Sequence, residues 1–105
     1  MTGAHGFIMT TTPSKDDAAR IARLLIDEKL AACVQLLAIE SFYSWQGATQ
    51  NAPETLMLIK TRTALFERAI ARIKQVHPYT VPEIVGTPFT AGLASYLNWI
   101  DEVTE

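Results

Sequence analysis

Short runs of apolar and β-branched residues, separated by turn residues, predict four strands. They cover residues 6–12, 33–45, 54–63 and 83–89, and each run has a length typical of strands. Gly47 and the Thr-Gln-Asn that follows it predict a turn, so the second and third runs form a long hairpin. Gly86 and Pro88 place the last strand at an edge of the sheet.

Apolar residues spaced three and four apart predict three helices, over residues 15–30, 64–77 and 92–103. Ser14 is followed by acidic residues, which predicts an N-cap and a first turn that suits the helix dipole. Thr63 is the expected N-cap of the second helix. Pro78 ends that helix, because the residue before a proline avoids the helical conformation.

The order strand, helix, strand, strand, helix, strand, helix predicts an α+β fold: a ferredoxin-like βαββαβ plait with an additional C-terminal helix. We expect a single domain over residues 1–105, in which residues 1–5 form a flexible tail that includes His5. Helices cover one face of such a sheet. The long hairpin is apolar on both faces, so its other face needs cover from further copies of the chain, which predicts an oligomer.

Composition and charge exclude several classes of protein. The chain is 49% hydrophobic, which supports a packed core and excludes global disorder. A net charge of −2 argues against a nucleic-acid partner. No apolar run reaches membrane-spanning length, and the first residues lack the pattern of a secretory signal. The lone Cys33 fits a reducing compartment, so we expect a cytoplasmic protein. No catalytic motif is present, and we expect no enzyme activity.

Five motifs in order give the chain a family resemblance. They are EKLAACV (28–34), SFYSWQG (41–47), LMLIKT (56–61), HPYTVPE (77–83) and YLNW (96–99). Together they make the chain resemble the CutA divalent-cation tolerance family from about residue 7 to residue 100. The resemblance implies a ferredoxin-like protomer in a homotrimer whose hairpins pair with neighbouring subunits, similar to the PII signalling trimer. It also implies a role in tolerance to divalent metals, copper above all, without enzyme activity.

The chain departs from the family pattern at three places. Some members have a cysteine treated as a copper ligand at the position of Thr10, and a threonine is a poor ligand for such metals. Some have two histidines before the proline of the HPY motif, where this chain has Val76 and then His77. A Pro-Gly pair within the second strand is absent. These departures leave the predicted fold unchanged and weaken the case for copper binding.

His77 and Glu83 are the predicted metal ligands. They lie six residues apart with prolines between them, and an imidazole with a carboxylate suits zinc or copper(II). Two ligands are too few for a tight site, so equivalent groups from neighbouring subunits would complete it. A histidine at a helix end also caps carbonyl groups, and we weigh that role ahead of ligation for His77. Glu83 has an equally good alternative, an ion pair with Lys60 or Arg62 on an adjacent strand.

The remaining candidates define a cleft. Lys60, Arg62 and Tyr79 are predicted to line it, and the two basic residues share a strand face. We expect Cys33 to be a small core residue. The chain also carries many tyrosines and tryptophans, which either wall a pocket or anchor subunit contacts, and we favour the contacts. These are Tyr43, Trp45, Tyr79, Tyr96 and Trp99.

The predicted function is non-enzymatic: weak binding of a divalent cation, copper or zinc, at clefts between the subunits of a homotrimer. The alternative is a PII-like trimer that binds a small anionic or nucleotide ligand in the same clefts, although no glycine-rich phosphate loop is present. A small phosphate-ester hydrolase on the same fold is disfavoured, because MTTTPS (9–14) lacks the glycines that such a loop needs.

Overall fold

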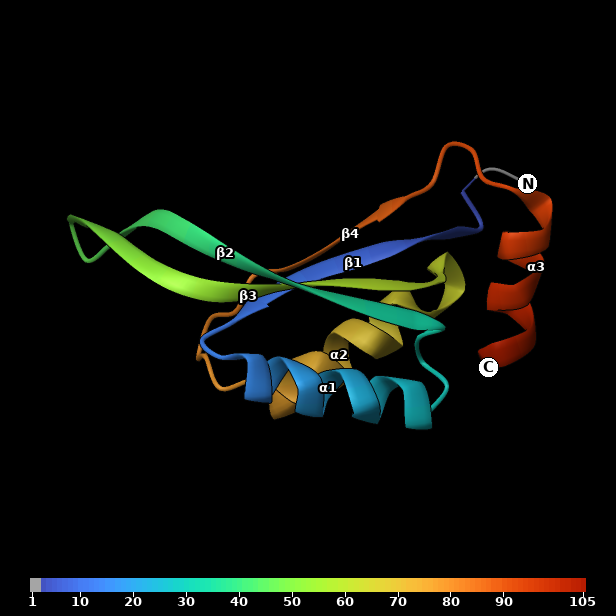
Figure 1. The fold of residues 1–105 in the computed structure, drawn as a ribbon, viewed down its shortest axis with the longest axis horizontal. Helices are drawn as coiled ribbons and strands as arrows, with labels where there is room; N and C mark the ends of the chain where they lie inside the picture. Colours follow the sequence, from blue (N-terminus) through green and yellow to red (C-terminus); the bar gives the residue numbers. More distant parts are fainter. Residues whose placement is uncertain (1–2) are drawn as a thin grey trace.

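A computed structural model describes residues 3–105 and confirms the predicted order of elements (Figure 1). A short 3₁₀ turn, η1 (Thr63–Leu65), precedes the second helix. The strands and helices are β1 (His5–Thr12), α1 (Lys15–Asp27), β2 (Cys33–Trp45), β3 (Ala48–Arg62), α2 (Phe66–Val76), β4 (Ile84–Pro88) and α3 (Ala94–Val103).

The sheet has the strand order β2-β3-β1-β4, and every neighbouring pair is antiparallel. This is the order of the ferredoxin-like plait, so the predicted fold class is confirmed. The helices α1 and α2 cover one face of the sheet (Figure 1). The third helix, α3, lies at one end of the sheet and contacts β3. As predicted, β4 is an edge strand.

The core lies between the sheet and the two helices. Because successive side chains of a strand point to opposite faces, Ile8 and Ile59 face the helices and are fully buried. Ile21, Leu25 and Ile73 meet them from α1 and α2. Each such side chain contributes roughly 1.5–3 kcal/mol when it leaves water. The burial of this one face fixes which residues point to the other.

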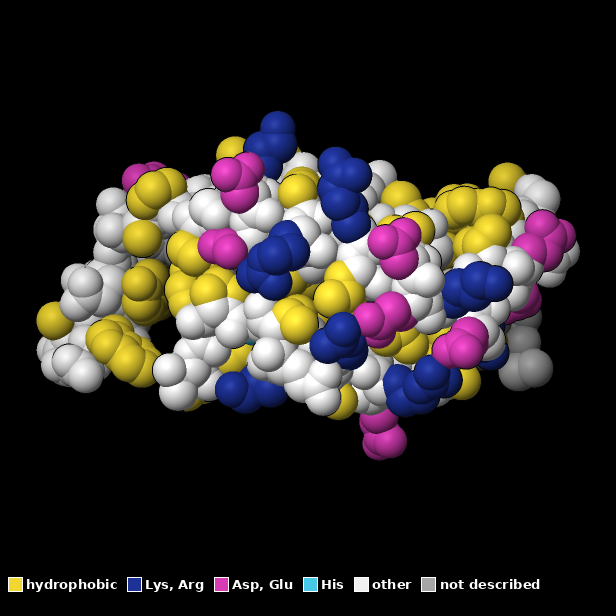
Figure 2. All heavy atoms as spheres, turned by 90° about the horizontal axis from the view of Figure 1, so that it is seen from below, with side chains coloured by type: hydrophobic (Ala, Val, Ile, Leu, Met, Phe, Trp, Pro, Cys, Tyr) yellow, Lys and Arg dark blue, Asp and Glu magenta, His cyan; other side chains and the backbone are white. Residues whose placement is uncertain are grey.

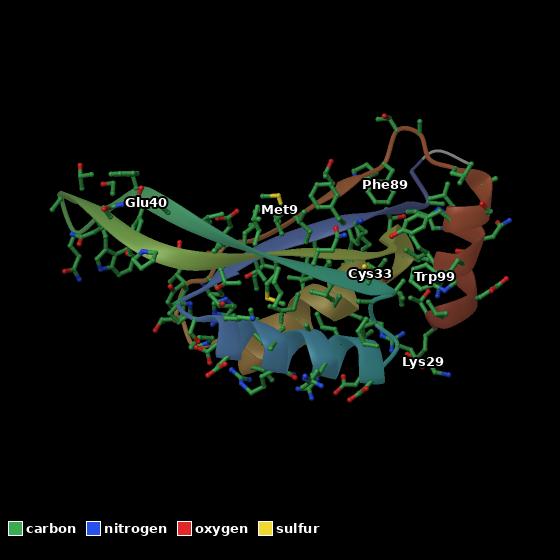
Figure 3. The ribbon with its side chains drawn as sticks, in the orientation of Figure 1. Met9, Lys29, Cys33, Glu40, Phe89 and Trp99 are labelled. Atoms are coloured by element: carbon green, nitrogen blue, oxygen red, sulfur yellow. The ribbon has the colours of Figure 1, made fainter. Side chains whose placement is uncertain are left out.

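The opposite face of the sheet is open and apolar. Met9 points away from α1 and α2 (Figure 3), and the large aliphatic Leu37 and Val85 are 58% and 53% exposed. The helix side looks different: seen from below, it carries Lys and Arg interspersed with Asp and Glu (Figure 2). Arg72, for example, bonds Glu28 at 2.8 Å across the two helices. The charged helix side is therefore a typical solvent-exposed surface, whereas the open face of the sheet exposes apolar side chains to solvent.

The hairpin of β2 and β3 extends beyond the rest of the sheet. The last residue of β1, Thr12, pairs with Thr55, and Ala38 pairs with Thr55 from the other side. Residues 39–54 therefore pair only with each other as a two-stranded arm, which projects from the body in Figure 1. We call residues 39–54 the arm.

The turn of the arm is shorter than predicted. Residues 49–51, expected in the turn, belong to β3, which begins at Ala48. Gln46 and Gly47 have φ angles of 51° and 80°, and two consecutive residues with positive φ complete a tight hairpin turn by themselves. The third strand is thus six residues longer at its start than the apolar pattern predicted.

Three other boundary predictions were wrong. The first helix ends at Asp27 rather than at residue 30, and Lys29 has a φ of 59°, which no helix continues. Thr63 does not cap α2; its hydroxyl donates to the Gly3 carbonyl oxygen, and η1 precedes the helix. His5 is not in a tail but is the first residue of β1.

His5 is held tightly at that position. Its side chain is buried, and its Nε2 lies 2.8 Å from Asp101 Oδ1 of α3. The expected tail also included Met1 and Thr2, which lie outside the described residues. No helix within residues 3–105 is long and apolar enough to cross a membrane.

Candidate functional site

The loop between α2 and β4 is anchored by His77. Its Nε2 lies 2.8 Å from the Thr11 carbonyl oxygen, and its Nδ1 accepts a hydrogen bond from the Tyr79 backbone N–H at 3.1 Å. These two bonds require a hydrogen on Nε2 and a lone pair on Nδ1. His77 therefore joins the end of β1 to the loop, with both ring nitrogens in use.

Burial lowers the pKa of His77 below its ordinary value of 6.5, and the bond to the Thr11 carbonyl opposes this effect only in part. Desolvation disfavours the charged imidazolium. The ring is thus held neutral at pH 7, in agreement with its hydrogen bonds.

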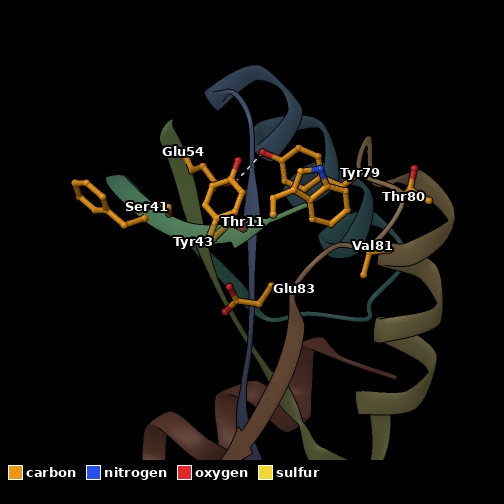
Figure 4. Close-up of a pocket in the computed structure, with 10 residues that line it drawn as sticks. Thr11, Ser41, Tyr43, Glu54, Tyr79, Thr80, Val81 and Glu83 are labelled. Carbon is orange, nitrogen blue, oxygen red and sulfur yellow. Dashed lines mark hydrogen bonds between the residues drawn. The ribbon is translucent and has the colours of Figure 1, made fainter. Parts of the chain in front are cut away.

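Tyr79 ties the loop to the arm. Its hydroxyl donates to Glu54 Oε2 at 2.7 Å (dashed in Figure 4). Burial, followed by the hydrogen bond and the charge of Glu54, raises the pKa of Tyr79 above its ordinary value of 10.0, so the hydroxyl keeps its proton. Within residues 3–105 this is the one side-chain hydrogen bond that joins the arm to another element. Lys74 holds the other side of the loop through the Thr80 carbonyl, at 2.9 Å.

A pocket of about 460 Å³ lies between the arm and this loop. Figure 4 shows its residues: Tyr43 and Glu54 come from the arm, and Tyr79 and Glu83 come from the loop. Trp45 also lines it. Within the described part of the chain, no lysine, arginine or histidine lines this pocket. The wall itself therefore contributes two carboxylates and no cationic side chain, and the Lys74 ammonium lies behind it on the Thr80 carbonyl.

The predicted site residues fall into two groups. Tyr79 and Glu83 line the pocket, and His77 lies beneath Tyr79, with ring centroids 5.1 Å apart. Lys60 and Arg62 lie at the other end of the sheet, beside α3. There the Lys60 Nζ is 5.8 Å from the centre of the Tyr96 ring, and Arg62 Nε donates to Thr104 Oγ1 at 3.1 Å.

One chain therefore does not bring the basic residues into the pocket. The alternative ion pair of Glu83 with Lys60 or Arg62 on an adjacent strand is wrong, because β4 pairs with β1 and not with β3. That Lys60, Arg62 and Tyr79 line one cleft between subunits stays a prediction.

Cys33 is half-exposed rather than buried. It pairs with Lys60, and that register puts its side chain on the open face of the sheet (Figure 3). The apolar residues beside Cys33 indicated a core position, but they do not show which face of the sheet the helices cover.

Sequence reasoning missed Glu54 as a pocket residue. It also treated the aromatic residues as one set, whereas the structure divides them. Tyr43, Trp45 and Tyr79 line the pocket, and Tyr96 and Trp99 pack on each other along α3, with ring centroids 5.6 Å apart. The exposed turn sequence Trp-Gln-Gly was the available signal that Trp45 sits at the end of a hairpin.

A tight copper or zinc site does not fit within one chain. Residues 3–105 contain no group of three or more His, Cys, Asp or Glu side chains that could hold a metal ion, and such sites use three or four protein ligands. Both nitrogens of His77 are already bonded. Thr10 is fully buried on the helix side, and its hydroxyl has no hydrogen-bond partner. What the pocket does offer is carboxylate oxygen.

Comparison with known proteins identifies the family of the chain. Residues 6–103 match the family described as CutA1 divalent ion tolerance protein. The divalent-cation tolerance protein CutA of Archaeoglobus fulgidus is 44% identical over 101 residues, 96% of this chain and 99% of that protein. That of Thermus thermophilus is 44% identical over 98 residues, 92% of this chain and 95% of that protein.

Solved structures give the same result. The A. fulgidus protein, described there as periplasmic, matches with a TM-score of 0.94 over 96% of this chain and 99% of that chain, at 44% identity. CutA from Xylella fastidiosa matches with a TM-score of 0.94 at 37% identity, over 97% of this chain and 99% of that chain. The chain belongs to the CutA1 divalent ion tolerance family.

The buried, neutral His77 predicts a pH-dependent stability. Because its folded-state pKa lies below 6.5, the unfolded chain takes up this proton first as the pH falls. The contribution of His77 to the free energy of unfolding should therefore decrease from the unfolded pKa down to the lowered folded pKa and change no further below it. Urea unfolding of wild type and His77→Gln from pH 8 to pH 4, at equal protein concentration, measures this. The variant should show a shallower loss on acidification, and parallel profiles would contradict it.

Proposed function

We propose that the chain is a non-enzymatic divalent-cation tolerance protein that acts in the cytoplasm as a homotrimer and binds copper or zinc weakly at clefts between subunits. The relatives named above are described as divalent-cation tolerance proteins. The observation that carries the proposal for this chain is the pocket between arm and loop, which presents Glu54 and Glu83 with no basic residue of the described chain in its wall.

Glu83 is the proposed ligand, and Glu54 supports it. Glu54 uses Oε2 to accept the Tyr79 hydrogen bond, so its other oxygen remains for a cation. Two carboxylate oxygens from one chain make a weak site for a borderline metal ion.

The ligand role predicted for His77 stays a prediction. Ligation through Nε2 would break the bond to Thr11, and ligation through Nδ1 would break the bond from Tyr79. Within one chain the contacts favour a positioning role instead: His77 holds Tyr79, and Tyr79 holds Glu54. The proposal therefore separates the ion-binding carboxylates from the histidine that positions them.

The homotrimer is supported by the open face of the sheet. Leu37 and Val85 are more than half exposed on it. On the arm, Phe42 is 68% exposed on the other face of the hairpin. An apolar surface of this kind on a small domain favours association with further copies. Pairing among copies would also place pockets next to one another and add ligands to each.

The alternative of a PII-like trimer with an anionic or nucleotide ligand has less support. Its basic residues, Lys60 and Arg62, lie against Tyr96 and Thr104, away from the pocket. The pocket itself carries charge of the same sign as a phosphate. We therefore place the cation proposal first.

Removal of one pocket carboxylate should weaken zinc binding. We expect Glu83→Gln and Glu54→Gln each to raise the dissociation constant by about tenfold, equivalent to about 1.4 kcal/mol. Glutamine still accepts the Tyr79 hydrogen bond, so Glu54→Gln tests charge rather than the tether. Calorimetric titration with zinc at pH 7 measures both variants. Glu102→Gln, an exposed acid on α3, is the control and should leave the constant unchanged.

His77→Gln distinguishes positioning from ligation in the same titration. We expect zinc affinity to fall by no more than about twofold, because a positioning residue contributes only indirectly. A loss equal to that of Glu83→Gln would make His77 a ligand, and unchanged affinity in every carboxylate variant would refute the proposed site.

Self-association should depend on the open sheet face. The wild type should sediment at three times the protomer mass, and Leu37→Glu should shift it towards the monomer, because a buried carboxylate without a partner is costly. Ile26→Glu is the matched control, since Ile26 is a 40% exposed aliphatic residue on α1. Analytical ultracentrifugation of both variants measures this. A wild-type monomer, or equal dissociation in both variants, would contradict the proposed assembly.

A further inference from the structure

The aromatic wall of the pocket has a function that a metal ion does not explain. Tyr43, Trp45 and Tyr79 line it together with Phe42, and Trp45 is 53% exposed. A hydrated metal ion gains little from aromatic rings, because its ligands are oxygen, nitrogen and sulfur atoms. The rings therefore point to a ligand with apolar surface of its own.

The charge of the pocket limits that ligand further. Glu54 and Glu83 are its charged lining residues, and no cationic side chain of residues 3–105 lines it. The faces of aromatic rings carry partial negative charge, so rings and carboxylates attract the same partner, a cation. An anion or a neutral ligand would use only part of this wall.

At the other end of the molecule, an aromatic ring already has a cation from the same chain beside it. There the Nζ of Lys60, from β3, lies 5.8 Å from the centre of the ring of Tyr96, on α3. Within residues 3–105 this is the one cation–π contact. Among the described residues the pocket rings make no such contact. Tyr79 instead packs on the ring of His77, whose two nitrogens make the hydrogen bonds of a neutral imidazole.

We infer that the pocket between the arm and the α2–β4 loop binds a small organic cation, an alkylated ammonium ion, with Tyr43, Trp45 and Tyr79 against its alkyl groups and Glu83 and Glu54 against its charge. Aromatic faces with nearby carboxylates are the usual recognition of such ions. The volume of about 460 Å³ lies within the range of small-molecule pockets. The Tyr79–Glu54 hydrogen bond holds one ring and one carboxylate in place before the ligand arrives.

This inference does not rest on the proposed metal function, although the two share the carboxylates. An organic cation needs the rings, and a metal ion does not. Substitution of a ring therefore separates the two proposals, whereas substitution of Glu83 affects both.

The experiment is a chemical-shift titration by NMR with tetramethylammonium chloride, and with tert-butanol as a neutral probe of similar size. We expect tetramethylammonium to shift the amide signals of Gly47, Thr80 and Val81, and tert-butanol to bind at least about tenfold more weakly, a difference of about 1.4 kcal/mol. Sodium chloride at equal concentration corrects for ionic strength.

Two ring variants complete the test. Trp45→Ala should lower the affinity for tetramethylammonium by at least about fivefold, and Trp45→Phe, which keeps a ring face, should retain most of it. Trp45 is exposed near the end of the hairpin, so the fold should tolerate both changes, and the unperturbed signals of β1 check this. Trp99→Phe on α3 is the control and should leave the affinity unchanged.

Several outcomes would overturn the inference. Equal binding of the two probes would make the pocket merely apolar, and unchanged affinity in Trp45→Ala would place the ion elsewhere. Absence of any shift by tetramethylammonium, with the pocket signals instead dependent on protein concentration, would mean that another copy of the chain fills the pocket. Zinc affinity that falls with tetramethylammonium affinity in Trp45→Ala would mean that the rings serve only to hold the carboxylates.

Discussion

The structure depends on a mismatch in strand length. β1 ends at Thr12, opposite Thr55, while β2 and β3 continue to Trp45 and Ala48. The arm therefore leaves the sheet with no third strand beside it, and a two-stranded ribbon is only marginally stable by itself. The hydrogen bond from Tyr79 to Glu54 supplies the missing connection, because it fixes the arm to the loop that β1 and α2 hold through His77.

That connection also makes the pocket. The arm forms one wall and the loop forms the other, so the distance between Tyr43 and Glu83 depends on how the arm is held. Burial lowers the pKa of His77 and raises the pKa of Tyr79, so it reinforces the neutral forms that the hydrogen bonds need. One chain of contacts, from Thr11 through His77 and Tyr79 to Glu54, therefore sets the arm, the pocket and its charge together.

Much of the fold was predictable from the sequence, because each strand and helix carries its own periodicity and the order of elements leaves few topologies. The family resemblance rested on motifs in the same segments. The arm turn was predicted at Gly47 but too long, because its two positive φ angles occur at Gln46 and Gly47 and a glutamine gives no signal for that conformation. His5 was assigned to a tail because its partner, Asp101, lies 96 residues away.

The candidate site was predictable only where its residues are close in sequence. His77, Tyr79 and Glu83 belong to one motif, and the structure keeps them in one loop. Glu54 was missed because its bond to Tyr79 spans 25 residues and depends on the path of that loop. Lys60 and Arg62 were grouped with them from charge alone, but Lys60 pairs with Phe7 while Glu83 precedes the pairing of Ile84 with Thr10. The alternation of side chains along the strand predicted that Lys60 and Arg62 share a face. It did not predict at which end of the sheet they lie.

Whether the Tyr79 hydroxyl holds the arm can be measured by amide hydrogen exchange of wild type and Tyr79→Phe. The variant removes one hydroxyl and keeps the ring. Amides of the arm should exchange at least about tenfold faster in Tyr79→Phe, as expected when a local opening loses a stabilising bond. Amides that pair β1 with β3 should be unchanged. Equal protection of the arm in both proteins would show that something other than this hydrogen bond holds it.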